Sequence, residues 1–143
     1  MKEQVTILSI DDDPQICFAL GELFKFQGWR AISANDVESG LEAFRRYSPG
    51  IVLIDYHMPG ASGIEGVKLL RKRSSSVPII VFTIDESQVV ADTFLAAGAS
   101  DFALKPIKAP DIVSRIKLHL RLAEQNRSEP SFSKGISGGT LDI

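Results

Sequence analysis

Hydrophobic residues gather in five short runs along the chain, at residues 5–10, 31–34, 51–54, 79–82 and 102–104. The runs are rich in β-branched or aromatic side chains, and most lack the polar alternation of a strand with one face in solvent. They are therefore predicted to form five strands of a parallel sheet that is covered on both faces.

The segments between these runs carry apolar residues at helical spacing, and turn or cap residues mark their ends. Asp13 and Pro14 are suited to the N-cap and first turn of one helix, and Pro49 follows the end of the next. A third helix is expected from about residue 64 to 73. Gly98 ends the fourth helix and Pro110 opens the fifth.

Five alternations of strand and helix predict an α/β fold with an open, doubly wound parallel sheet. Right-handed crossovers leave few topologies, and the flavodoxin-like (βα)5 arrangement with strand order 2-1-3-4-5 fits best. Residues 1–123 are predicted to form this single domain. From residue 124 to 143 the chain is rich in Ser and Gly, and we interpret it as a flexible tail or linker.

Composition narrows the possible partners. The 143 residues are 44% hydrophobic and 24% charged, with a formal net charge of −2. That charge predicts no direct nucleic-acid binding and no attraction to an anionic membrane. The apolar run before the first acidic residues is too short for a signal sequence or membrane span. The single cysteine, Cys17, excludes an intramolecular disulfide, and a cytoplasmic location is expected.

Polar residues stand at the carboxyl ends of the predicted strands, where ligands bind in folds of this kind. They are Asp11 and Asp12 after strand one, Asp55 after strand three, Thr83 after strand four and Lys105 after strand five. Strands one and three are neighbours in the predicted order, so the three carboxylates should converge. Clustered carboxylates need a cation, and hard oxygen ligands suit Mg²⁺ or Mn²⁺ better than zinc.

Together, these side chains predict phosphoryl transfer. A carboxylate nucleophile, a divalent metal, a lysine and a hydroxyl make a site that can move a phosphoryl group onto Asp55. Asp13 has a structural role as an N-cap and is left outside the metal site. No separate organic cofactor is expected.

Four motifs in order resemble a known family. The chain reads SIDDDP at the first strand, LIDYHMPGASG around Asp55, VFT ending in Thr83, and GASDFALKP ending in Lys105 and Pro106. Over residues 4–123 this closely resembles the response-regulator receiver domain of two-component signal transduction. The resemblance implies a phosphorylation-dependent switch that catalyses its own phosphorylation and dephosphorylation, and not a metabolic enzyme.

The resemblance also implies roles for single residues. Asp55 would accept the phosphoryl group, and Asp11, Asp12, Asp55 and the backbone carbonyl of His57 would bind Mg²⁺ or Mn²⁺. Thr83 would hydrogen-bond a phosphoryl oxygen. Lys105 would pair with Asp55 or its phosphate, in a cis peptide with Pro106.

The resemblance implies two kinds of partner: a protein that donates the phosphoryl group, and an effector that recognises the phosphorylated receiver. The donor would be a histidine kinase or a histidine phosphotransfer protein. Phe102 matches the family's aromatic switch, which turns inward when Thr83 moves and changes the surface of helix four, strand five and helix five. A downstream effector domain or protein would bind that surface. The family also forms homodimers through the fourth and fifth helices, and the sequence does not decide whether this chain does so.

Two alternative functions are considered. One is a degenerate receiver that acts as a protein-interaction module without phosphate. The other is a phosphohydrolase of the haloacid dehalogenase type, against which Pro14 and the lack of a downstream acidic pair count.

Four further residues carry hypotheses. Ile84 stands where the family usually has a small residue, and it would narrow access to the site. Phe18 falls opposite the apolar stripe of its helix and would dock a partner protein. His57, two residues after Asp55, would tune how water reaches a phosphate, and His119 is expected on a helix surface.

Overall fold

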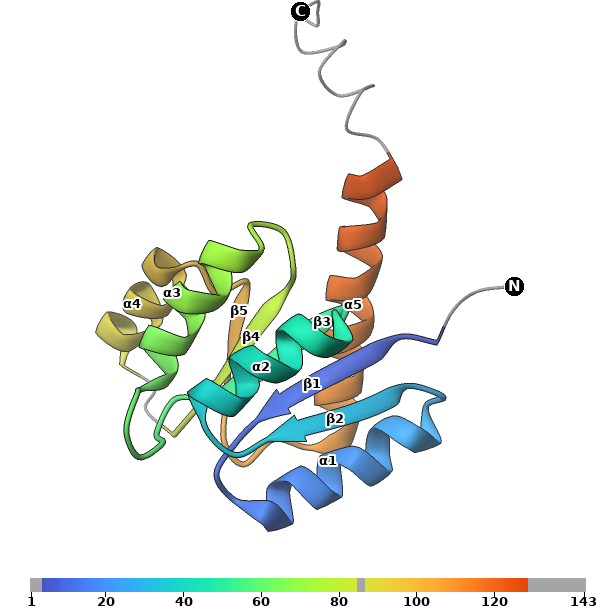
Figure 1. Cartoon of the computed structure of the whole chain (residues 1–143), viewed down its shortest axis with the longest axis horizontal. Helices are drawn as coiled ribbons and strands as arrows, with labels where there is room; N and C mark the ends of the chain where they lie inside the picture. The colour runs from blue at the N-terminus through green and yellow to red at the C-terminus, as the bar shows by residue number, and fades with distance from the viewer. Residues whose placement is uncertain (1–3, 85–86, 129–143) are drawn as a thin grey trace, which may run out of the picture.

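The computed structural model describes residues 4–84 and 87–128, which form one sheet with helices on both faces (Figure 1). All strand pairs are parallel and the order is β2-β1-β3-β4-β5, so the predicted fold is confirmed. The strands are β1 (Thr6–Ile10), β2 (Arg30–Ala34), β3 (Ile51–Asp55), β4 (Ile79–Thr83) and β5 (Asp101–Leu104).

The helices begin and end close to the predicted positions. They are α1 (Pro14–Phe26), α2 (Val37–Tyr47), α3 (Gly63–Arg73), α4 (Gln88–Ala97) and α5 (Ala109–Ser128). Asp13 caps α1 as predicted, because its side chain accepts a hydrogen bond from the Gln15 amide. Gly98 ends α4 in the left-handed region at φ 113°.

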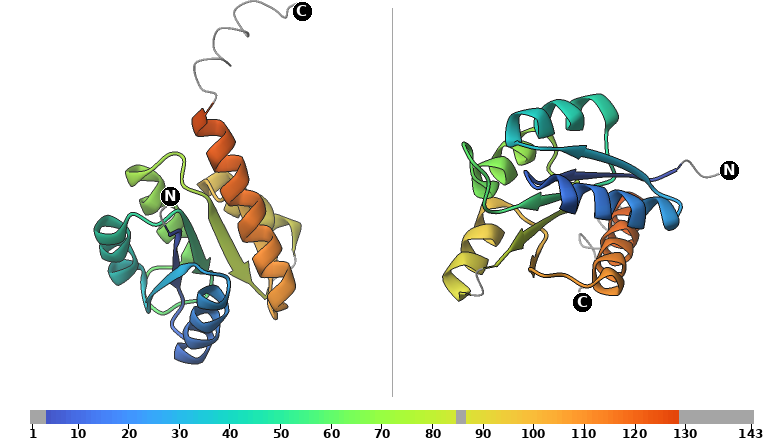
Figure 2. Two further views of the ribbon diagram at one scale, coloured as in Figure 1. Left: turned by 90° about the vertical axis from the view of Figure 1, so that its right-hand side faces the viewer. Right: turned by 90° about the horizontal axis from the view of Figure 1, so that it is seen from below.

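Each face of the sheet has its own hydrophobic core. Helices α1 and α5 cover one face and α2, α3 and α4 cover the other (Figure 2). Phe24 of α1 and Ile116 of α5 are fully buried on the first face, as are Leu70 of α3 and Phe94 of α4 on the second. Each such side chain stabilises the fold by roughly 1.5–3 kcal/mol. Because both faces are covered, β3 and β4 are buried along their whole length.

The register brings the carboxyl ends of the strands to one edge of the sheet. Ile10 pairs with Ile54, so the residues that follow β1 lie beside Asp55 at the end of β3. Thr83 pairs with Leu104, so Lys105 emerges beside the end of β4. Four chain segments that are far apart in sequence therefore meet at this edge.

The predicted tail differs from the structure at its start. Helix α5 continues to Ser128, so residues 124–128 are helical. They contain good helix formers and precede the first proline of the tail, Pro130. The rest of the predicted tail lies outside the described residues. Within residues 4–84 and 87–128, no helix is both long enough and apolar enough to cross a lipid bilayer.

His119 is not the surface residue that the sequence predicts. Its side chain is only 14% exposed, and Nε2 lies 3.0 Å from Asp101 Oδ2. Arg115 contacts the same carboxylate, with Nη1 2.9 Å from Oδ2. The two side chains, four residues apart on α5, share one helix face and fasten it to the start of β5.

Candidate functional site

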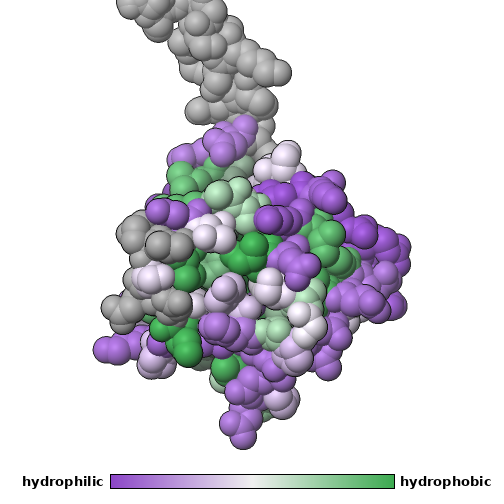
Figure 3. Space-filling view, turned by 90° about the vertical axis from the view of Figure 1, so that its left-hand side faces the viewer, coloured by the Kyte–Doolittle hydropathy of each residue, from purple (hydrophilic) through white to green (hydrophobic). Residues whose placement is uncertain are grey.

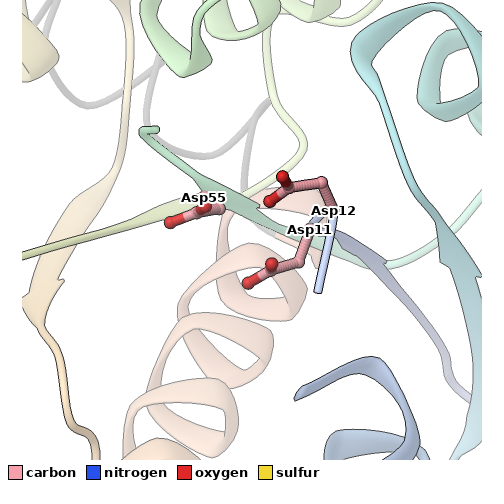
Figure 4. Close-up of side chains that lie close together, drawn as sticks. All are labelled: Asp11, Asp12 and Asp55. Carbon is pink, nitrogen blue, oxygen red and sulfur yellow. The ribbon is translucent and has the colours of Figure 1, made fainter. Parts of the chain in front are cut away.

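Three carboxylates meet at the carboxyl edge of the sheet. One oxygen of each of Asp11, Asp12 and Asp55 lies within 4.8 Å of the others (Figure 4). Asp11 and Asp55 are buried, and Asp12 is exposed. The predicted convergence is therefore confirmed, and its cause is the β1–β3 pairing.

Lys105 enters the same site from β5. Its Nζ lies 2.9 Å from Asp55 Oδ1 and 3.1 Å from Asp11 Oδ2. The Lys105 amide donates a 2.8 Å hydrogen bond to the Thr83 carbonyl, which ties the lysine to the end of β4. The Lys105–Pro106 peptide is cis, as the family resemblance implied.

The charges of the site do not balance. Burial raises the pKa of Asp55, Lys105 lowers it, and the negative charges of Asp11 and Asp12 raise it again, so the net shift is upward. Burial lowers the pKa of Lys105, but its hydrogen bonds and charge contacts with Asp55 and Asp11 outweigh this and raise it. One ammonium group thus faces three carboxyl groups, so a further cation in the site would be stabilised by the excess negative charge.

The donor set fits a hard divalent metal. Three carboxylate oxygens lie within 4.8 Å of one another, and the exposed Asp12 leaves the site open to water. Mg²⁺ and Mn²⁺ prefer oxygen ligands and keep part of their water shell, whereas zinc prefers nitrogen and sulfur. The residues present therefore suit Mg²⁺ or Mn²⁺.

Close packing of the backbone holds Asp55 in place. The Gly63 amide donates a 3.0 Å hydrogen bond to the Tyr56 carbonyl. A Cβ on Gly63 would lie 2.6 Å from the Asp55 carbonyl oxygen and 2.8 Å from Tyr56 Cα, closer than real Cβ atoms approach. Only glycine lets the start of α3 pack so tightly against the loop after β3. His57, in that loop, is exposed, and its role as a metal ligand stays a prediction.

Thr83 and Phe102 occupy positions that suit the predicted switch, and their roles in it stay predictions. Thr83 is fully buried at the end of β4. Phe102 is half-buried in β5, and its ring centroid lies 6.3 Å from that of Phe94. Phe94 in turn packs edge-on against Tyr56 at 5.0 Å. The sequence did not predict that Tyr56 and Phe94 meet, because no local pattern shows which aromatic rings come together across the fold.

Two apolar side chains near the site are exposed. Ile84, one residue after Thr83, is 69% exposed, and Phe18 of α1 is 71% exposed. Phe18 and Cys17 line a hollow of about 710 Å³ that reaches Asp11 and Asp12. The predicted exposure of Phe18 is therefore confirmed, and its docking role stays a hypothesis.

Known proteins share the fold and the sequence pattern. Residues 7–117 match the family model for the response regulator receiver domain. The chain is 32% identical to the DNA-binding response regulator MtrA of Mycolicibacterium smegmatis, over 96% of this chain and 58% of that protein. It is 35% identical to the sensory transduction protein RegX3 of the same organism, over 85% of this chain and 53% of RegX3.

A solved structure agrees with these matches. The CheY-like response regulator receiver domain protein of Methanospirillum hungatei superposes with a TM-score of 0.83 at 25% identity. The superposition covers 87% of this chain and 99% of that one. The chain thus spans a whole receiver structure but little more than half the length of the relatives MtrA and RegX3.

One prediction from composition is wrong. The net charge led us to expect no direct nucleic-acid binding, yet a relative aligned over 96% of the chain is named a DNA-binding response regulator. Net charge was a poor guide because it averages over the 143 residues, whereas the relatives extend well beyond the aligned region.

Proposed function

The chain belongs to the response regulator receiver domain family, and on that premise we propose that Asp55 accepts a phosphoryl group in a Mg²⁺-dependent reaction. Receiver domains of response regulators are signalling switches and not classical enzymes. The proposed donor is the phosphohistidine of a histidine kinase or of a histidine phosphotransfer protein. The proposed reaction is catalysed by the receiver's own residues, and so is the later loss of phosphate.

One observation carries the proposal: the buried Asp55 carboxylate pairs with a lysine and lies close to two further acids at the open edge of the sheet. In the transfer step, an Asp55 carboxylate oxygen attacks phosphorus and the bond from phosphorus to the histidine nitrogen breaks. The electron pair of that bond returns to the donor imidazole. Hydrolysis by water then restores the carboxylate and releases inorganic phosphate.

Each neighbouring side chain has a place in this reaction. Asp11 and Asp12, with Asp55 and the His57 carbonyl, would hold Mg²⁺, which neutralises charge on the transferring oxygens when it is bound. Lys105 Nζ, already 2.9 Å from Asp55 Oδ1, would stabilise the negative charge of the phosphoryl group. The Thr83 hydroxyl would donate to a phosphoryl oxygen.

The output is proposed to be a changed surface formed by α4, β5 and α5. Movement of Thr83 toward the phosphoryl group would let Phe102 turn further inward against Phe94, so one added anion would bias a packed element between two arrangements. Leu95 of α4, Leu104 of β5 and Leu118 of α5 are between 40% and 50% exposed on these elements. Figure 3, which faces the α3 and α4 side, shows hydrophobic surface among the hydrophilic side chains.

The proposed reader of this surface is a DNA-binding effector. The support is the name of the relative MtrA, a DNA-binding response regulator of which the chain spans 58%. The effector would be part of the same polypeptide or a separate protein, and in either case the receiver would control it through phosphorylation of Asp55.

Intact-mass measurement tests the proposal. The protein is incubated with acetyl phosphate and Mg²⁺, and the Asp55→Asn variant is treated in parallel. We expect the wild type to gain one phosphoryl group and the variant to gain none. Leaving out Mg²⁺ should abolish the gain. An unmodified wild type would instead support the phosphate-independent interaction module, and a modified variant would show that the acceptor is another residue.

A further inference from the structure

The opposite edge of the sheet, where the strands begin, holds a second hollow. It measures about 970 Å³, and elements at that end of the sheet surround it: the start of β1, the loop into β2, the end of α2, and α5. Figure 2 (left) views this end of the molecule, with the N-terminus toward the reader. The five-residue strand β1 separates it from Asp11 by roughly 16 Å. The hollow is therefore distinct from the site at Asp55.

Positive charge dominates this hollow. Its charged lining residues are Arg30, Lys117, Arg121 and Glu124. None of the ion pairs found among residues 4–84 and 87–128 involves any of the three cations. Three cations and the one carboxylate of Glu124 leave a net positive charge around this concave space, which favours an anionic ligand.

An aromatic ring lies against the arginine nearest the strands. Tyr47 and Trp29 also line the hollow. The Arg30 guanidinium lies over the Tyr47 ring at 5.0 Å, and the Arg46 guanidinium approaches the same ring at 5.5 Å. A cation–π contact leaves the N–H groups of a guanidinium as donors, and such donors bind phosphate oxygens.

The size and shape of the space restrict the ligand further. A volume near 970 Å³ is in the range of small-molecule sites, and it exceeds what one phosphate or carboxylate needs. An elongated anion with several charges could reach cations on both β2 and α5. A concave space also suits a small molecule better than a convex nucleic-acid duplex.

We propose that this hollow binds the polyphosphate group of a nucleotide. Arg30, Lys117 and Arg121 contact the phosphate oxygens, and Trp29 offers ring surface to the nucleoside. The nucleotide site does not depend on phosphorylation of Asp55. A result that excludes nucleotide binding would therefore leave the proposed function intact, and a result that excludes phosphorylation of Asp55 would leave the nucleotide site intact.

The single tryptophan of the chain provides the assay, because Trp29 lines the hollow. The wild-type protein is titrated with ATP, AMP and tripolyphosphate while its tryptophan fluorescence is recorded. Mg²⁺ is left out, so that nothing recruits phosphate to the acidic site. We expect saturable changes with ATP and tripolyphosphate, and at least about tenfold weaker binding of AMP.

Charge variants identify the site. Arg121→Gln and Lys117→Gln should each weaken ATP binding by about three- to tenfold. Arg45→Gln is the matched control, because Arg45 pairs with Glu42 outside this hollow and the variant loses the same charge. Amide chemical shifts should move around residues 29–30 and 117–121 and stay fixed at residues 11–13 and 55.

Three results of the nucleotide titrations would overturn the proposal. These are the absence of a saturable change with ATP and tripolyphosphate, an equal loss of affinity in the Arg45 control, or AMP binding as tight as ATP. Duplex DNA is tested by competition. If DNA binds through the same three cations and ATP does not displace it, the surface is a nucleic-acid contact and the nucleotide site is rejected.

Discussion

Lys105 Nζ lies 2.9 Å from Asp55 Oδ1, in an ion pair whose lysine side chain is 20% exposed and whose carboxylate is 7% exposed. The same ammonium group reaches Asp11, so it is the positive charge on which two buried acids depend. The pair stabilises the metal-free fold, and it also holds the proposed acceptor at the position where phosphate would arrive.

Replacing Lys105 should therefore have a metal-dependent effect on stability. In Lys105→Met, two buried carboxylates lose their counter-ion, and we expect the free energy of unfolding to fall by about 2 kcal/mol without Mg²⁺. With saturating Mg²⁺ the loss should shrink, because the dication supplies the missing charge. Urea denaturation in both conditions measures this. Equal losses with and without Mg²⁺ would contradict a shared role of lysine and metal.

Removing Asp12 should weaken metal binding without weakening the fold. Asp12 is exposed, and in the metal-free protein it adds a third negative charge to the cluster. We expect Asp12→Ala to lower Mg²⁺ affinity about tenfold or more, because affinity follows the number of charged ligands. Thermal unfolding without metal should not be lowered. Calorimetric titration with Mg²⁺ tests the first expectation, and unchanged affinity would remove Asp12 from the metal site.

The glycine at the start of α3 should not tolerate a side chain. Gly63→Ala places a Cβ 2.6 Å from the Asp55 carbonyl oxygen, and we expect a loss of about 2–3 kcal/mol in unfolding free energy. Gly21→Ala is the control. Gly21 lies within helix α1, and its added Cβ would be 4.0 Å from Ala31 Cβ, which is ordinary van der Waals contact. That variant should be stabilised by up to about 1 kcal/mol. Denaturant titration compares the two, and equal stability of both would contradict the close packing described.

Ile84 should affect rates and not stability. Its side chain is 69% exposed, so Ile84→Ala removes little buried area. If the isoleucine narrows access to Asp55, the alanine variant should gain phosphate from acetyl phosphate faster, lose it faster, or both. Time-resolved intact-mass measurement follows both rates. The hypothesis is discarded if neither rate changes.

Phe18 should affect transfer from a protein donor alone. The side chain is 71% exposed beside the hollow that reaches Asp11 and Asp12. We expect Phe18→Ala to slow transfer from the cognate phosphohistidine protein by about tenfold, because exposed aromatic residues often anchor interfaces. Phosphorylation by acetyl phosphate should be unchanged. Phe26→Ala on the same helix, at 87% exposure, is the matched control. If Phe18→Ala and Phe26→Ala slow transfer from the protein donor equally, the cause is a general loss of apolar surface and not a docking contact of Phe18.

The pattern of residues along the chain determined the strands, most helix ends and the strand order. The strands and helix ends depend on forces between near neighbours: Asp13 caps the next turn, Gly98 adopts a left-handed conformation, and β-branched runs favour buried strands. The right-handedness of crossover connections then predicted the strand order, and the binding of ligands at the carboxyl ends of strands indicated which edge of the sheet holds the site. The meeting of Asp11, Asp12 and Asp55 follows from them, which is why the sequence located the candidate site.

Which individual side-chain atoms touch across distant segments was decided by the tertiary structure. Lys105 and Asp11 are 94 residues apart, and only the folded chain shows that one ammonium group contacts both Asp11 and Asp55. His119 was misplaced for the same reason, because nothing near it in sequence reveals its partner Asp101. Side-chain distances depend on how helices and sheet close upon one another. Local preferences choose the elements, and packing chooses which of their side chains touch.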